Sequence, residues 1–82
     1  MAKVVLTRRA AKDLEELDSQ TKRRILEKLQ MNAANPLQQS VKLTASKLGT
    51  YRYRVGDYRI IFDLEGDILT VLRVGHRREI YL

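Results

Sequence analysis

The stretch that decides the fold spans residues 51–62 and reads YRYRVGDYRIIF. Its first five residues alternate strictly, with two tyrosines and a valine on one face and two arginines on the other, as in a half-buried β-strand. Gly56 and Asp57 make a two-residue turn of the kind that closes a hairpin. The residues that follow are rich in β-forming side chains. We therefore expect an antiparallel hairpin of strands 51–55 and 58–64.

The chain after this hairpin continues the same pattern. Residues 65–67, Glu-Gly-Asp, make a second tight turn, and residues 68–74 make a third strand, which Gly75 should end. Residues 76–82 finish the chain. This half of the sequence therefore predicts a three-stranded antiparallel meander.

The segment before the hairpin begins with a short strand and a helix. Residues 3–6 have the composition of a strand, and Thr7 is a suitable helix N-cap. Ala10, Leu14 and Leu17 then recur at i, i+4 and i+7, which places them on one helical face.

A second helix follows, and Ser19 can cap it. Its apolar face comprises Ile25, Leu26, Leu29 and Ala33. Asn35-Pro36 should end this helix, because the residue before a proline avoids the α region. Residues 37–50 are polar and poorly periodic, and we interpret them as a loop that leads into the sheet.

Together these elements predict an α+β fold. It consists of an N-terminal strand, a two-helix hairpin and a three-stranded antiparallel meander, with the helices packed on one face of the sheet. With 82 residues and no linker-like or repeated segment, the chain has room for one domain, residues 1–82.

The chain is strongly basic. Sixteen Lys and Arg against ten Asp and Glu give a net charge of +6, which points to a polyanionic partner, either nucleic acid or an acidic protein. Four basic residues lie on the outer side of the second helix: Lys22, Arg23, Arg24 and Lys28. This outer side is either a solvated face or a surface that binds a partner.

The composition also excludes several classes of protein. There is no cysteine and only one histidine, His76, so a disulfide framework, a thiolate zinc site and a histidine-rich metal site are ruled out. The longest aliphatic run, residues 4–6, is far too short for a signal sequence or a membrane span. We expect a cytoplasmic protein with no membrane contact.

The hairpin register places arginines side by side. If Gly56 and Asp57 are the loop residues, Arg54 lies opposite Arg59, and Arg52 shares their face within roughly 5–8 Å. Like charges across a pair of strands are unfavourable, so the cluster makes sense if an anion sits among the arginines. The alternative is that an acidic side chain pairs with them: Asp57, Asp63 or Glu79.

The last residues add further chemistry. Arg77 and Arg78 bring two more cations. His76 either exchanges protons near neutral pH or is a strand-end histidine bonded to a backbone carbonyl. Tyr81 either stacks on a base and transfers a proton or packs against the sheet. For Arg73 we expect a structural ion pair, with Asp63 or Asp67 as partner.

These residues resemble a known family. Residues 51–62, together with residues 72–81, LRVGHRREIY, are similar to the RelE branch of the RelE/ParE toxin superfamily. Its members are toxins of type II toxin–antitoxin pairs. The resemblance implies an endoribonuclease that enters the ribosomal A site, cuts the mRNA codon and so inhibits translation. It also implies that no metal or other cofactor takes part, because the ribose 2′-hydroxyl attacks its own 3′ phosphate and leaves a 2′,3′-cyclic phosphate.

The resemblance also implies a role for each candidate catalytic residue. Arg52 and Arg54 would lie beside the scissile phosphate, and Arg59 would stabilise charge in the transition state. Arg77 would protonate the leaving 5′ oxygen. Tyr81 would stack on the codon base and orient the attacking ribose.

His76 and Arg78 are auxiliary residues in this interpretation. The family's fold also supports a second function, ParE-like inhibition of DNA gyrase without nuclease activity, and a third possibility is RNA binding without catalysis. The partners implied are a cognate antitoxin, the ribosome with mRNA in its decoding A site, and operator DNA bound through the antitoxin.

Overall fold

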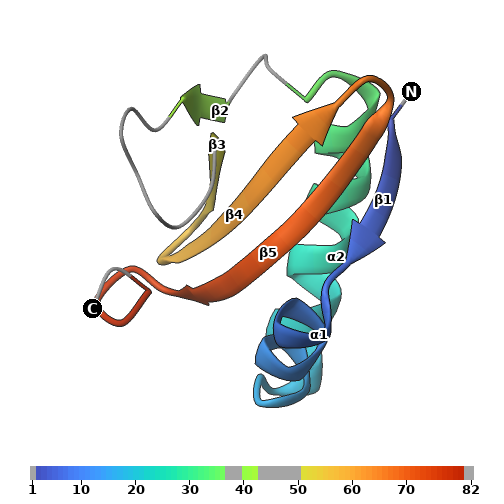
Figure 1. Ribbon diagram of the computed structural model, residues 1–82. Coiled ribbons are helices and arrows are strands. Elements are labelled where there is room, and N and C mark those ends of the chain that lie inside the picture. Colours follow the sequence, from blue (N-terminus) through green and yellow to red (C-terminus); the bar gives the residue numbers. More distant parts are fainter. Residues whose placement is uncertain (1, 37–39, 43–50, 81–82) are drawn as a thin grey trace.

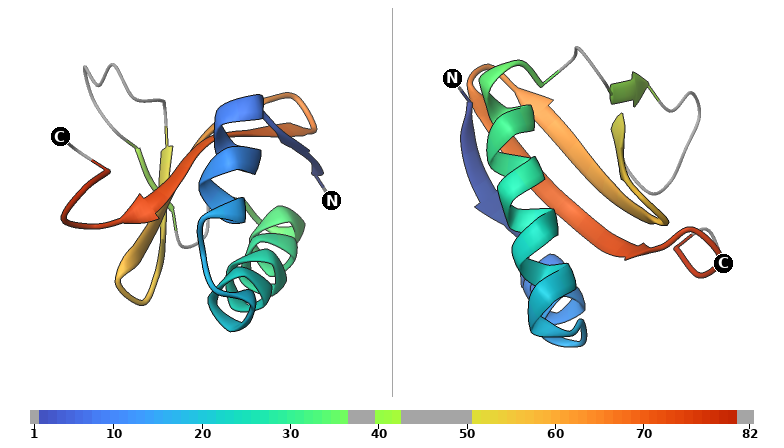
Figure 2. Two further views of the ribbon diagram at one scale, coloured as in Figure 1. Left: turned by 90° about the horizontal axis from the view of Figure 1, so that it is seen from below. Right: turned by 180° about the vertical axis from the view of Figure 1, so that it is seen from behind.

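The structure is a computed structural model that describes residues 2–36, 40–42 and 51–80 (Figure 1). Its elements, in chain order, are β1 (Lys3–Leu6), α1 (Arg8–Glu15), α2 (Ser19–Ala34), β2 (Ser40–Lys42), β3 (Tyr51–Val55), β4 (Tyr58–Glu65) and β5 (Ile68–His76). Both helices lie on the same side of the sheet (Figure 2). The predicted α+β fold and its order of elements are confirmed.

The strands form one mixed sheet in the order β1-β5-β4-β3-β2. The predicted meander is β3, β4 and β5, and all of its pairings are antiparallel. The N-terminal strand β1 is parallel to β5. Two tight turns connect the meander, and each has a glycine with positive φ, Gly56 at 58° and Gly66 at 60°, as such turns require.

Two predicted boundaries in the sheet were wrong. Within the segment interpreted as a loop, Ser40–Lys42 form β2, which pairs with β3. Three residues are too few for a periodic signal, so pairing with β3 defines this strand. Gly75 does not end β5, because it stays in the ladder opposite Arg59, and His76 pairs opposite Tyr58.

The helices begin at hydrogen-bonding side chains. Thr7 caps α1 as predicted, and its hydroxyl accepts from the backbone N–H of Ala10. The cap of α2 is Asp18 rather than Ser19. Asp18 has extended backbone angles, and its carboxylate accepts from the backbone N–H of Thr21 at 3.2 Å. None of the helices in the described ranges is long and apolar enough to cross a membrane.

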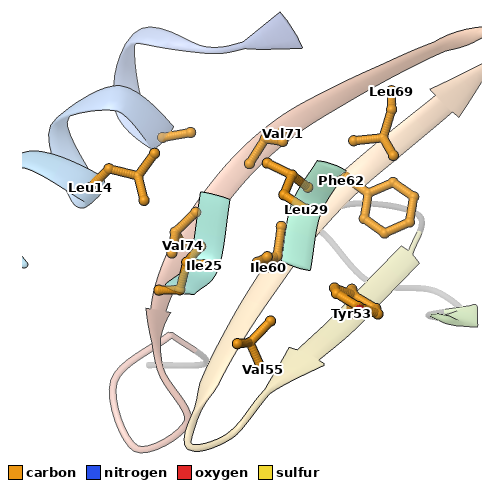
Figure 3. Packing of buried hydrophobic residues seen from close by; sticks show 11 residues of the cluster. Leu14, Ile25, Leu29, Tyr53, Val55, Ile60, Phe62, Leu69, Val71 and Val74 are labelled. Carbon is orange, nitrogen blue, oxygen red and sulfur yellow. The ribbon is translucent and has the colours of Figure 1, made fainter. Parts of the chain in front are cut away.

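The core lies between the helices and the inner face of the sheet (Figure 3). Ile25 and Leu29 of α2 are almost fully buried there, as are Ile60 and Phe62 of β4. Burial of a side chain of this size contributes about 1.5–3 kcal/mol. Since the inner face of β3 and β4 is apolar, their alternate residues face away from the helices.

Thr7 joins β1 and α1 to the centre of the sheet. Its backbone N–H donates to the carbonyl oxygen of Val71 at 3.0 Å, and its hydroxyl donates to the same oxygen at 2.9 Å. The hydroxyl oxygen also accepts from Ala10 at 3.1 Å. One side chain therefore caps the helix and fixes its start on β5.

We predict that Thr7→Ala lowers the free energy of unfolding by about 1–2 kcal/mol, because both the cap and the hydroxyl bond to Val71 are lost. Urea denaturation measures this change. Thr7→Ser is the matched control, since it keeps the hydroxyl and should retain most of the stability. Equal losses in the two variants would contradict the capping role.

Asp18 gives a pH-dependent prediction. Hydrogen bonds from the Thr21 side chain, and then from the Thr21 backbone, lower the pKa of the Asp18 carboxyl below its ordinary value. A carboxyl with a lower pKa in the folded state stabilises the fold above its unfolded pKa, and this stabilisation is lost as pH falls through the folded value. We therefore expect the Asp18→Ala variant to have a lower melting temperature than the wild-type protein at pH 7.

Thermal unfolding from pH 7 to pH 2 tests this expectation. The difference in melting temperature between wild type and Asp18→Ala should become smaller as pH falls below about 4. Asp18→Asn, which caps without a charge, should keep a gap to Asp18→Ala that does not depend on pH. A wild-type gap that stays constant down to pH 2 would show that the ionised carboxylate is not the cap.

Candidate functional site: arginines at the hairpin tip

The two arginines of β3 lie on the sheet face opposite the helices. Tyr53 and Val55 are buried in the core, so alternation along the strand places Arg52 and Arg54 on the other face. Arg52 is half-buried and Arg54 is exposed. The predicted register is confirmed, since Arg54 lies opposite Arg59. Side chains so paired have their β-carbons about 4.5–5.5 Å apart.

Arg59 does not project outward as the sequence suggested. Only 9% of it is exposed, and its Nη1 atom donates to the carbonyl oxygens of Gly56 and Tyr58, each at 3.0 Å. The guanidinium therefore lies against the turn of its own hairpin. The two carbonyl dipoles offset part of the repulsion from Arg54, so the like-charged pair is tolerated.

Arg77 reaches the same turn from the end of β5. Its backbone N–H donates to the carbonyl oxygen of Asp57 at 2.8 Å. Its Nε atom lies 3.9 Å from Oδ1 of Asp57. Both side chains are more than half exposed, and an exposed pair of this length is worth little. The Arg77 guanidinium is therefore available to another anion.

Residues 77–80 form a turn that folds back onto this face. The backbone N–H groups of Glu79 and Ile80 donate to the carbonyl oxygen of His76. Ile80 is buried, and its side chain lies over Gly75, which faces the same way as Arg59 across the ladder. This packing holds the turn, and Arg77 with it, beside the hairpin tip.

His76 sits at the base of this turn. Its Nδ1 atom accepts from the backbone N–H of Arg78 at 3.2 Å, so its partner is a backbone donor rather than the expected backbone carbonyl. The ring meets Tyr58 edge to face, with centroids 5.6 Å apart. In this arrangement Nδ1 already accepts a hydrogen bond, which leaves Nε2 as the ring nitrogen that can interact with a ligand.

The structure thus brings three of the predicted catalytic residues to the hairpin tip, namely Arg54, Arg59 and Arg77. Arg52 lies two residues away on the same face of β3, and His76 and Arg78 flank Arg77. Tyr81 lies outside the described residues. The described residues contain no group of three side chains that could hold a metal ion.

Asp13 is a structural residue that sequence reasoning missed. Its Oδ2 atom accepts from Nε of Arg73 and from the backbone N–H of Val74, both at 3.0 Å. The predicted ion pair of Arg73 is therefore present, but with Asp13 instead of Asp63 or Asp67. Only 10% of the Asp13 side chain is exposed.

The position of Asp13 contained a signal. It lies three residues after Ala10 and directly before Leu14, on the buried side of α1, where an unpaired carboxylate would be costly. Because β1 ends opposite Val71, the edge of β5 needs another acceptor beyond that point, and Asp13 supplies it. The pairing of Asp13 with a strand edge about sixty residues away cannot be predicted from the residues around it.

A hollow of about 500 Å³ lies beside this ion pair, at the edge of β5. Its charged lining mixes signs, since it includes Arg9 and Arg73 together with Asp13, Glu16 and Glu79. Such a lining does not select an anion. The face around the hairpin tip is richer in cations and is the better candidate for a polyanion site.

The fold and this cationic face define a small α+β protein with a cluster of arginines on the sheet face opposite its helices. Residues 4–81 match the model of a family described as the ParE toxin of the type II toxin–antitoxin system parDE. A curated relative, Toxin RelE3 from Methanocaldococcus jannaschii, is 35% identical over 83 residues, covering 96% of this chain and 94% of the relative. The chain therefore belongs to the RelE/ParE superfamily of toxins of type II toxin–antitoxin systems.

Solved structures agree with this assignment. A chain of the RelBE2 toxin–antitoxin complex from Mycobacterium tuberculosis is 26% identical, with a TM-score of 0.84, covering 93% of this chain and 98% of that one. A chain of the RelB–RelE complex from Methanococcus jannaschii is 30% identical, with a TM-score of 0.70 and 94% of each chain covered. The family model has the ParE name and these relatives have the RelE name, and both names belong to this one superfamily.

We predict that Asp13→Ala lowers the free energy of unfolding by about 2–4 kcal/mol, since it leaves Arg73 and the Val74 N–H without their acceptor. Asp13→Asn can still accept one bond but lacks the charge, so it should lose about half as much. Denaturant unfolding of both variants measures these losses. A neutral Asp13→Ala would contradict the structural role of the carboxylate.

Proposed function

We propose that this chain is a ribosome-dependent endoribonuclease that cuts mRNA in the A-site codon and so inhibits translation in the cytoplasm. The observation that carries this proposal is the meeting of Arg54, Arg59 and Arg77, from β3, β4 and the end of β5, at one hairpin tip. Folding does not need such a cluster. A metal-free RNA cut does need it, because preorganised cations stabilise the extra negative charge of the transition state.

The proposed reaction uses the RNA as its own nucleophile. The ribose 2′ oxygen bonds to the adjacent phosphorus, the bond from phosphorus to the 5′ oxygen breaks, and a 2′,3′-cyclic phosphate and a 5′-hydroxyl result. The proton of the 2′-hydroxyl leaves to a base, and the 5′ oxygen gains a proton. Alignment of the reacting groups alone can supply about 7–11 kcal/mol.

The residue roles are those that the resemblance to RelE toxins implies for these positions. Arg52 and Arg54 hold the scissile phosphate, and Arg59 stabilises the charge of the pentavalent state. In the same scheme the exposed Arg77 supplies the proton to the leaving oxygen. Tyr81 stacks on the codon base.

The base that accepts the 2′-hydroxyl proton lies elsewhere. Guanidinium groups stay protonated at neutral pH and make poor bases. His76 uses Nδ1 to accept from Arg78, and in that tautomer its Nε2 atom carries the proton and has no lone pair to offer. The remaining candidates are Tyr81 and a group of the ribosome.

The partners extend this proposal. Several similar structures are toxin–antitoxin complexes, which supports a cognate antitoxin for this chain as well. The net charge of +6 suits an acidic antitoxin and the ribosomal A site alike. Operator DNA would be bound through the antitoxin.

A second candidate is ParE-like inhibition of DNA gyrase, without nuclease activity. Two observations favour it: the family model has the ParE name, and Arg59 already bonds its own hairpin. In that case the arginines of the tip would contact a protein rather than a phosphate.

Primer extension on ribosomes programmed with a defined mRNA tests the proposal. We predict a new stop within the A-site codon and a 2′,3′-cyclic phosphate end, both absent with free mRNA. Arg54→Gln and Arg59→Ala should each slow cleavage by about 10²–10³-fold. Arg54 is exposed, so its variant tests the chemistry with no cost to the fold.

The outcomes separate the candidates. Cleavage that persists at the wild-type rate in the folded Arg54→Gln and Arg59→Ala variants would overturn the assigned site. If wild-type protein leaves the ribosome-bound mRNA uncut, the nuclease proposal is wrong. In that event, loss of gyrase supercoiling activity in the presence of the protein would support the second candidate.

A further inference from the structure

Arg24 of α2 lies against the turn of the β3–β4 hairpin. A β-carbon placed on Gly56 would be 3.5 Å from its Nη2 atom, 3.6 Å from Nη1 and 3.7 Å from Cζ. These three distances are nearly equal, so the flat guanidinium faces the turn rather than touching it with one atom. The contact joins α2 to the tip that carries the arginine cluster, so the Arg24 side chain does not stay on the outer side of the helix as the sequence suggested.

The turn is therefore flanked by arginines on both sides of the sheet. On the face away from the helices, Arg59 bonds the Gly56 carbonyl and Arg54 is exposed next to it. On the helix side, Arg24 covers the same glycine. Because Gly56 has no side chain, the two groups of cations are separated by backbone alone.

The Arg24 guanidinium remains available to an outside anion. Arg24 is exposed, and within the described ranges no carboxylate lies within 4.0 Å of its nitrogens. Arg9, Arg73 and Arg77, by contrast, each face an aspartate. A guanidinium that is positioned by packing but has no carboxylate partner is well suited to a phosphate.

We propose that Arg24 and the Gly56-Asp57 turn form a second phosphate site, which binds a phosphodiester of the RNA chain next to the one held by the arginine cluster. The RNA backbone crosses the hairpin tip and contacts cations on both of its sides. This inference rests on the proposed function, because it assumes that the cluster holds RNA. Arg24 acts in binding and alignment and has no part in bond cleavage.

The first test measures RNA binding apart from cleavage. The probe is a short oligoribonucleotide with a 2′-deoxyribose at the cleaved position, titrated by fluorescence anisotropy over a series of salt concentrations. Loss of one phosphate contact should reduce the slope of log affinity against log salt by about 0.7. We expect Arg24→Gln to show this reduction and to bind about fivefold more weakly at physiological salt.

The matched control is Arg23→Gln. Arg23 is the neighbouring arginine of α2 and is also exposed, and its substitution removes the same charge while it leaves the Arg24 contact with Gly56 in place. It should leave the slope close to that of wild type. Arg24→Lys keeps the charge and should restore the slope, and thermal melting should show all three variants equally folded.

A second arm uses vacant ribosomes in a pelleting assay, and it distinguishes the source of the phosphate. Weaker binding of Arg24→Gln to the oligonucleotide supports the site as proposed, on the mRNA. Weaker binding to vacant ribosomes alone would overturn it and place the Arg24 contact on ribosomal RNA. Slopes and affinities equal to those of Arg23→Gln in both arms would overturn the inference. A reduced slope for Arg24→Gln with no cleavage by wild type would instead reject the nuclease proposal and leave the phosphate site standing.

Discussion

The register of the β3–β4 hairpin is the constraint on which the rest of the structure depends. The two-residue turn at Gly56-Asp57 sets Val55 opposite Tyr58 and Arg54 opposite Arg59. A slip of one residue along β4 would turn its apolar residues away from the helices and send Arg59 into the core. Burial of Ile60 and Phe62 therefore holds the arginines on the other face. Core packing and the cationic site are two consequences of the same pairing.

This register has an electrostatic cost, and the structure offsets it locally. Nη1 of Arg59 donates to two carbonyl oxygens of the turn. The carboxylate of Asp57 lies 3.9 Å from Nε of Arg77, so this exposed ion pair is only weakly stabilising. Arg59 is thus held in place by backbone carbonyls rather than neutralised by a carboxylate. Sites arranged in this way need little reorganisation when an anion arrives, which is the property that electrostatic catalysis requires.

The features that could be predicted from the sequence are those with a local cause. The alternation of residues 51–55, the turn after them and the apolar stripe of α2 each arise within a few neighbouring residues, and the Arg54–Arg59 pairing follows from the turn. The features that could not be predicted depend on distant partners. The strand β2 is defined by its pairing with β3. Arg73 pairs with Asp13, sixty residues away. Arg59 bonds carbonyl oxygens of the turn, a side-chain conformation that the sequence pattern does not specify.

Asp13 shows how such a distant contact serves the site. The parallel strand β1 ends opposite Val71, yet β5 continues to His76 before the turn that carries Arg77. Beyond Val71 the outer edge of β5 has no neighbouring strand among the described residues, and Asp13 of α1 takes the place of one by accepting from Val74. By accepting this bond, the Asp13 carboxylate stabilises the end of β5 beyond the point where β1 stops. Because Arg77 reaches the hairpin tip only if β5 extends this far, the first helix helps to set the geometry of the cationic site from the opposite side of the sheet.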